Sequence, residues 1–76
     1  MEERRLQELK ELMDEFKDSR CSYSYLRKEL YDFRSNLSWK YNHSTSQNMM
    51  LTREEYNSLI NQVNKLLKEL GEIQNN

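Results

Sequence analysis

Few side chains in this sequence could carry out chemistry, and the main candidates are His43 and Cys21. Catalysis needs a nucleophile or a proton carrier that a second group holds away from water. His43 is the single histidine, and it lies in a polar stretch where a solvated loop residue is expected. Arg20, beside Cys21, could lower the pKa of the thiol, but no histidine or aspartate is placed to complete a catalytic site. We therefore predict that the protein is not an enzyme.

Metal and cofactor binding are not expected either. A zinc site requires three or four nitrogen or sulfur ligands, and the chain offers one cysteine and one histidine. Carboxylates in the first segment lie along a predicted helix, where such clusters usually form a solvated face. They are Glu8, Glu11, Asp14, Glu15 and Asp18. The sequence also has no glycine-rich phosphate loop, so we predict no metal and no cofactor.

The composition restricts the fold class, the cellular location and the kind of partner that this chain can have. A chain of 76 residues forms one domain, residues 1–76, with a marginal core, and the absence of proline with only one glycine favours an all-α fold. The longest apolar run, 49–51, is too short for a membrane span. One cysteine cannot form a disulfide within the chain, so we expect a cytoplasmic protein, or a nuclear one. A net charge of −1 disfavours binding to nucleic acid through bulk charge.

The most clearly predicted helix spans residues 52–73. Thr52 and Glu55 form a capping-box pattern at its start, and Leu51 with Tyr56 forms a hydrophobic staple. Gly71 would suit a C-terminal cap, although the apolar pattern continues beyond it. Apolar residues recur at spacings of three and four, typical of a packed helix face. They are Tyr56, Leu59, Val63, Leu66, Leu70 and Ile73, with Ile60 and Leu67 beside them.

Two further helices are expected, at residues 2–17 and 24–41, with a polar loop at 42–51. Residues 18–24 favour caps and turns over helix interiors, which predicts a break. However, a seven-residue period crosses that break, which favours one continuous helix over 2–41. The period consists of Leu9, Phe16, Tyr23, Leu30 and Leu37. The sequence leaves both alternatives open.

The predicted architecture is an antiparallel helical hairpin, 24–41 on 52–70, or a three-helix bundle, with coiled-coil-like packing. If 2–17 extended the middle helix, its apolar stripe would be bare in a monomer. A dimeric or higher assembly would then cover it, and opposite charges in 1–19 and 20–41 could help to align the copies. The predicted self-association residues are Leu6, Leu9, Leu12, Met13 and Phe16.

The middle helix also carries the best candidate for a partner surface. On the side opposite its apolar face, aromatic rings alternate with charged residues, and exposed tryptophan and tyrosine are typical anchors of protein interfaces. The predicted partner-binding residues are Tyr25, Lys28, Tyr31, Asp32 and Trp39. The contrary interpretation is that the helix ends before Trp39 and that the indole folds back over the hairpin end.

Two functions follow from this pattern. The first is a small protein-interaction module, such as an adaptor, an assembly subunit or a small inhibitor or regulator of a larger machine, of the kind expected of viral or phage regulators. The alternative is a helical-hairpin nucleic-acid binder that uses Arg27, Lys28, Arg34 and Lys40. The scatter of these four cations around the helix weakens the second function. Nothing in the sequence identifies the partner or the biological process.

The apolar stripe of 52–73 generates a direct test of the architecture. Leu66→Asp or Val63→Asp should unfold the hairpin, because each variant buries an unpaired charge. The measurement is the helical circular dichroism signal and its thermal melting. If Leu66→Asp leaves both unchanged, the hairpin is not the fold of this chain.

Overall fold

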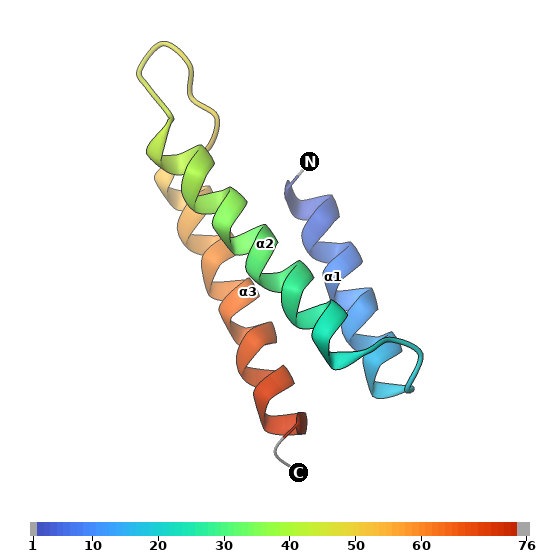
Figure 1. Cartoon of the computed structure of the whole chain (residues 1–76). Helices are drawn as coiled ribbons and strands as arrows, with labels where there is room; N and C mark the ends of the chain where they lie inside the picture. The colour runs from blue at the N-terminus through green and yellow to red at the C-terminus, as the bar shows by residue number, and fades with distance from the viewer. Residues whose placement is uncertain (1, 75–76) are drawn as a thin grey trace.

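The protein folds into three helices that pack against one another, as seen in a computed structural model that describes residues 2–74. The helices are α1 (Glu2–Lys17), α2 (Tyr23–Asn42) and α3 (Arg53–Gln74), arranged as an elongated bundle (Figure 1). The all-α prediction is confirmed. Of the two predicted architectures, the three-helix bundle is the one that forms.

The start of α3 has the predicted capping box. The backbone N–H of Thr52 donates to Glu55 Oε1 over 3.2 Å, and the N–H of Glu55 donates to Thr52 Oγ1 over 3.1 Å. These two bonds satisfy amide groups that have no partner inside the helix. At the other end the helix continues past Gly71, because Leu70 is buried and Ile73 packs against the core. Gly71 is therefore not the C-terminal cap.

A tight turn ends α1, so the single folded chain does not form the continuous helix over 2–41. The N–H of Arg20 donates to the carbonyl of Glu15 over 2.8 Å, and the N–H of Ser19 donates to the carbonyl of Phe16 over 3.0 Å. This pair of bonds is a Schellman motif, which requires a left-handed residue after the helix. Ser19 occupies that position with φ of 63°, so a serine adopts a conformation that favours glycine.

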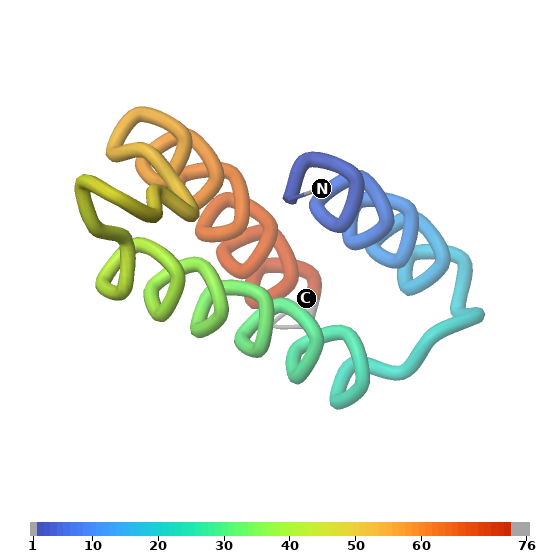
Figure 2. Tube along the Cα trace, turned by 90° about the horizontal axis from the view of Figure 1, so that it is seen from above, coloured from blue at the N-terminus to red at the C-terminus, as the bar shows by residue number. Residues whose placement is uncertain are grey.

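After this turn, Ser22 starts α2 by accepting a hydrogen bond at its hydroxyl oxygen from the N–H of Tyr25, over 3.1 Å. Figure 2 shows the segment 18–22 carrying the chain from the end of α1 to the beginning of α2. The seven-residue period survives the break because its members on both helices face the same core. Phe16 and Tyr23 meet directly across the turn, with ring centroids 6.3 Å apart.

The core is a single apolar cluster to which all three helices contribute. The α2–α3 pair is antiparallel, and the rings of Tyr41 and Tyr56 stack at its loop end with centroids 4.4 Å apart. The helix α1 covers the remaining side of this pair. The buried side chains are Leu6, Leu9, Met13, Leu26, Leu30, Phe33, Leu37, Leu51, Leu59, Val63, Leu66 and Leu70.

The predicted self-association stripe is therefore covered within one chain. Leu6, Leu9 and Met13 are at most 3% exposed, and Leu12 and Phe16 pack against the core from its edge. Because α1 folds back on its own hairpin, the bare stripe that was the reason for expecting a dimer does not exist in the single chain.

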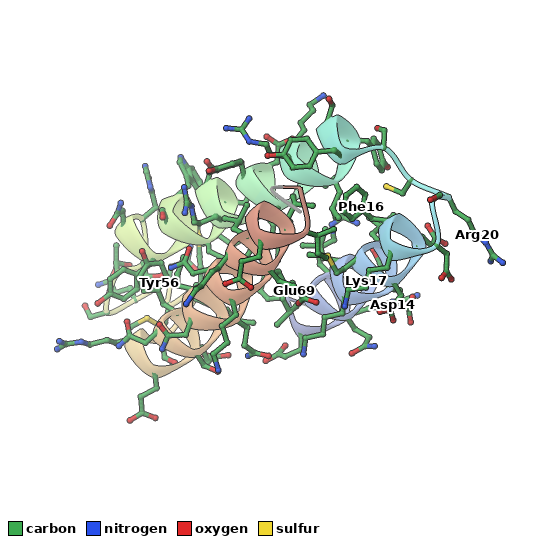
Figure 3. The ribbon with its side chains drawn as sticks, turned by 90° about the horizontal axis from the view of Figure 1, so that it is seen from below. Asp14, Phe16, Lys17, Arg20, Tyr56 and Glu69 are labelled. Carbon is green, nitrogen blue, oxygen red and sulfur yellow. The ribbon has the colours of Figure 1, made fainter. Side chains whose placement is uncertain are left out.

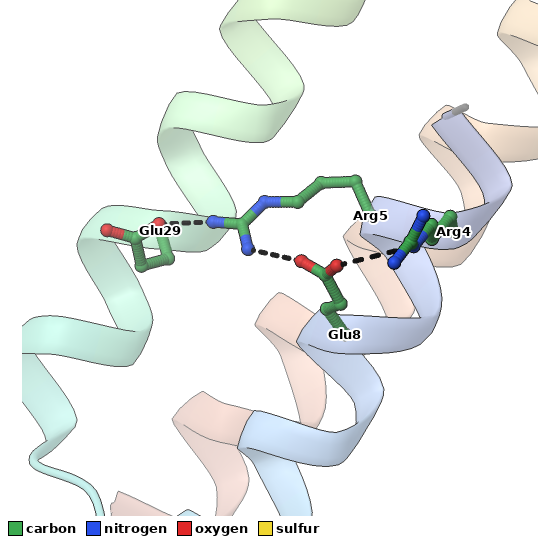
Figure 4. A network of polar contacts seen from close by, with 4 residues as sticks. All are labelled: Arg4, Arg5, Glu8 and Glu29. Atoms are coloured by element: carbon green, nitrogen blue, oxygen red, sulfur yellow. Dashed lines mark hydrogen bonds and ion pairs between the residues drawn. The ribbon is translucent and has the colours of Figure 1, made fainter.

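Ion pairs at the rim of the bundle link α1 to α2 and α3. Arg5 bridges Glu8 on its own helix and Glu29 on α2 (Figure 4). Lys17 Nζ lies 2.5 Å from Glu69 Oε1 on α3, and Figure 3 shows these side chains reaching toward each other. All of these side chains are partly exposed, and such ion pairs contribute only about 0–1 kcal/mol each. They align the helix, whereas the apolar core holds it.

The α2–α3 loop is organised around one serine. Ser44 Oγ donates to the carbonyl of Lys40 over 2.8 Å and accepts from the N–H groups of Met50 and Leu51, each over 3.2 Å. These bonds bring the two ends of the loop together and seat Leu51 in the core. The sequence predicted only a polar connector here, whereas the structure shows a loop ordered by the hydrogen bonds of Ser44.

The left-handed turn generates a stability prediction. Ser19→Gly should raise the free energy of unfolding by about 1 kcal/mol, because glycine adopts a positive φ without steric cost. The matched control is Ser35→Gly, at an exposed position inside α2, which should lower the stability by about 0.5 kcal/mol. Urea denaturation of the three proteins measures both. Equal destabilisation by the two glycines would contradict the left-handed turn.

Candidate partner-binding surface

The five predicted partner-binding residues are all exposed on α2, and none of them belongs to its buried face. We call Tyr25, Lys28, Tyr31, Asp32 and Trp39 the outer α2 face. Trp39 is 54% exposed, Tyr25 51% and Tyr31 37%. Lys28 and Asp32 are exposed between these rings. The core-facing residues of α2 lie on its other side, so bundle packing does not use this surface.

Two arginines hold the ring of Tyr31. The guanidinium carbon of Arg27 lies 4.9 Å from the ring centroid, and that of Arg34 lies 4.7 Å from it. Both distances are within the range of cation–π attraction. Arg34 also donates to Asn64 Oδ1 on α3 over 3.1 Å. These contacts therefore restrain the phenol ring, although it is open to solvent.

An open hollow of about 710 Å³ lies along the N-terminal half of this surface. Two tyrosine rings supply its apolar wall, while two cations and one carboxylate supply polar groups. Its lining residues are Tyr23, Ser24, Arg27, Lys28, Tyr31 and Asp32. A surface of this kind can take up side chains of another protein through both ring contact and charge.

At the C-terminal end of the outer α2 face, Trp39 stacks on His43. Their ring centroids are 4.1 Å apart and their planes differ by 16°. The helix continues to Asn42, and His43 caps it, with Nδ1 2.8 Å from the carbonyl oxygen of Trp39. The interpretation in which the helix ends early and the indole folds back is therefore wrong. His43 is exposed, as expected, but it packs on the indole.

Sequence reasoning missed both ring contacts, although their spacing was visible. Arg27 and Arg34 lie four residues before and three after Tyr31, and His43 lies four residues after Trp39. Residues three and four apart on a helix are neighbours. The exposed loop side chains of Met49, at 59%, and Met50, at 43%, were also missed. No periodicity in the loop indicates which of its apolar residues is buried.

Cys21 differs from the sequence expectation in its electrostatics. The side chain packs partly buried against the core, and its thiol donates to the carbonyl of Ser22 over 3.6 Å. Burial raises the pKa of the thiol above its ordinary value, and the nearby Glu15 carboxylate raises it further. Arg20 extends away from the bundle (Figure 3). The suggestion that Arg20 lowers this pKa is thus wrong.

The part of the chain that the structure describes offers neither a metal-binding group nor a membrane-spanning helix. Within residues 2–74, no three histidine, cysteine or acidic side chains form a group that could hold a metal ion. No helix among those residues has the length and hydrophobicity needed to cross a membrane. Comparisons of the chain with family models, curated proteins and solved structures find no match.

The raised pKa of Cys21 has a measurable consequence. At neutral pH less of the thiol is ionised than in the unfolded chain, so alkylation by neutral iodoacetamide should be slower in the folded protein. The rate–pH profile should have its midpoint above that of the urea-unfolded protein. Glu15→Gln should move the folded midpoint down slightly, because burial is the larger cause. A folded midpoint below the unfolded one would contradict this environment.

Proposed function

We propose that this protein is a small helical interaction module that acts by binding another protein through the outer α2 face, without catalysis of its own. The observation that carries the proposal is the exposure of Trp39 and Tyr25, each more than half open to solvent on a face that the core does not use. Large rings of these types supply most of the binding energy in protein interfaces when a partner buries them.

The contacts that restrain two of the exposed rings, Trp39 and Tyr31, support the proposal. The imidazole of His43 restrains the indole of Trp39, and two guanidinium groups restrain the phenol of Tyr31. Ordering a free side chain on binding costs about 0.5–1.5 kcal/mol, and a ring that is already held loses less. These two rings are thus preorganised for binding a partner.

The cations of α2 favour a protein partner over nucleic acid. Lys40 is paired with Glu2 of α1, and Arg34 donates to Asn64 of α3. Two of the four cations suggested for nucleic-acid binding are therefore engaged within the chain. Affinity for nucleic acid comes mainly from cations that neutralise phosphates, so this arrangement provides little of it.

The proposal includes a cytoplasmic location, coiled-coil-like packing of the helices and an ability to self-associate. Leu6, Leu9 and Met13 are buried in the single chain, so they can join two copies only if α1 leaves its own hairpin. A dimer that kept α1 in place would have to use another surface.

The test is affinity capture from a lysate with the native protein and with Trp39→Ala. Trp39→Ala should leave the helical signal and the melting temperature unchanged, because the indole is exposed. It should weaken binding to the purified partner by about 2 kcal/mol, which is roughly a thirtyfold loss of affinity, as expected for an interface anchor. The matched control is Met49→Ala, which removes an equally exposed apolar side chain from the loop and should retain the partner.

The affinities are measured by titration calorimetry once the partner is purified. Equal binding by native protein and Trp39→Ala would remove the outer α2 face from the proposal. A parallel titration with mixed oligonucleotides at low and moderate salt tests the other function. Salt-sensitive binding there would favour the nucleic-acid interpretation.

A further inference from the structure

The segment between α1 and α2 is compatible with two conformations. It consists of Asp18, Ser19, Arg20, Cys21 and Ser22, without glycine or proline, so nothing in it prevents a helix. In the folded chain it forms a turn that forces Ser19 to a φ of 63°. A left-handed conformation is unfavourable for a residue with a Cβ, so this turn is strained at one position.

The apolar pattern fits the helical alternative as well as the turn. Leu9, Phe16, Tyr23, Leu30 and Leu37 are seven residues apart through the segment, so one helix over 2–42 would place them on a single stripe. A chain with a straight helix can no longer fold α1 against its own α2. Its buried residues Leu6, Leu9 and Met13 would lose their cover.

A second copy of the same chain can provide that cover in full. The site that α1 leaves on α2 and α3 is complementary to α1 in shape and charge, because it already holds α1 in the single chain. Its apolar side chains belong to the same core cluster as Leu6, Leu9 and Met13, and its rim offers Glu29 to Arg5 and Glu69 to Lys17. Two opened chains that exchange α1 re-form these contacts twice, between copies.

The geometry allows the exchange to be symmetric. In the folded chain α1 and α2 run antiparallel, with Glu2 paired to Lys40 and Phe16 beside Tyr23. If the segment 18–22 becomes helical, the same pairings join two long helices that lie antiparallel. Their two-fold axis then passes near this segment, so each copy gives and receives α1 in the same way.

We propose that this protein forms a symmetric dimer by exchange of α1, in which residues 18–22 become helical and each α1 packs on the α2–α3 hairpin of the other copy. The core is the same in the monomer and in the dimer. The balance between them is therefore set by the protein concentration and by the conformation of Ser19. The exchange uses none of the outer α2 face, so it is independent of the proposed partner binding.

Measuring the oligomeric state of Ser19 variants tests whether the segment 18–22 acts as the hinge of the exchange. Proteins are unfolded, refolded at high concentration and measured by size-exclusion chromatography with light scattering. The native chain should populate monomer and dimer. Ser19→Gly should weaken the dimer by roughly a hundredfold, because glycine favours the turn and disfavours the helix at two hinges in each dimer. Ser19→Ala should strengthen the dimer several-fold, and the control Ser35→Ala should change it little.

Cross-linking tests the exchange itself. Two single-cysteine chains, each with Cys21→Ser, carry either Lys17→Cys or Glu69→Cys and are refolded as a mixture. In the exchanged dimer these positions meet between copies, as Lys17 and Glu69 do within the folded chain. A short bismaleimide should join the two different chains. The control replaces Glu69→Cys by Glu54→Cys, about 22 Å further along α3, and should give little product.

Two results would overturn the proposal. One is a monomer at every concentration for both the native chain and Ser19→Ala. The other is a dimer in which the Lys17→Cys and Glu69→Cys chains cross-link no better than the Glu54→Cys control. The second result would mean that the copies meet through another surface and that α1 stays on its own hairpin.

Discussion

The burial of the apolar face of α1 against α2 and α3 is the contact on which the rest of the structure depends. Each of Leu6, Leu9 and Met13 is at most 3% exposed. Fully burying side chains of this size contributes about 1.5–3 kcal/mol each, whereas an exposed ion pair such as Lys17 with Glu69 contributes about 0–1 kcal/mol. The apolar contact therefore holds α1, and the polar rim determines how it is aligned.

This contact also explains why the outer α2 face is free. With α1 and α3 both packed on one side of α2, residues such as Leu30 and Leu37 are fully buried. The opposite side has no structural role, so a tryptophan and two tyrosines there do not serve the core. The rings of Trp39 and Tyr31 contact the capping residue His43 and two arginines of α2, respectively, which restrains these two rings on the exposed side.

The same contact makes the turn at 18–22 decisive for assembly. Because the site for α1 is identical whether its own chain or a second copy fills it, packing energy does not distinguish the two arrangements. The conformational energy of the turn must therefore decide, and Ser19 contributes to it through an unfavourable left-handed conformation. Domain exchange depends on hinges of this kind, where a short connection is strained in the closed form.

The sequence by itself determined the helices, the start of α3 and the exposed aromatic side of α2. These features depend on residues within a few positions of one another, such as the capping box of Thr52 and Glu55, so local chemistry predicts them. The contacts of Arg27 and Arg34 with Tyr31 are equally local, since both arginines lie within about one turn of it, but the sequence analysis did not predict them.

Only the tertiary structure decided whether α1 extends α2 or folds back on it. The seven-residue period fits both forms, because it specifies which residues are buried but not which helix buries them. The burial of Leu9 against the hairpin and the turn at Ser19 settle the question for the single chain. The environment of Cys21 and the role of Ser44 were likewise fixed by contacts that form only after the chain has folded.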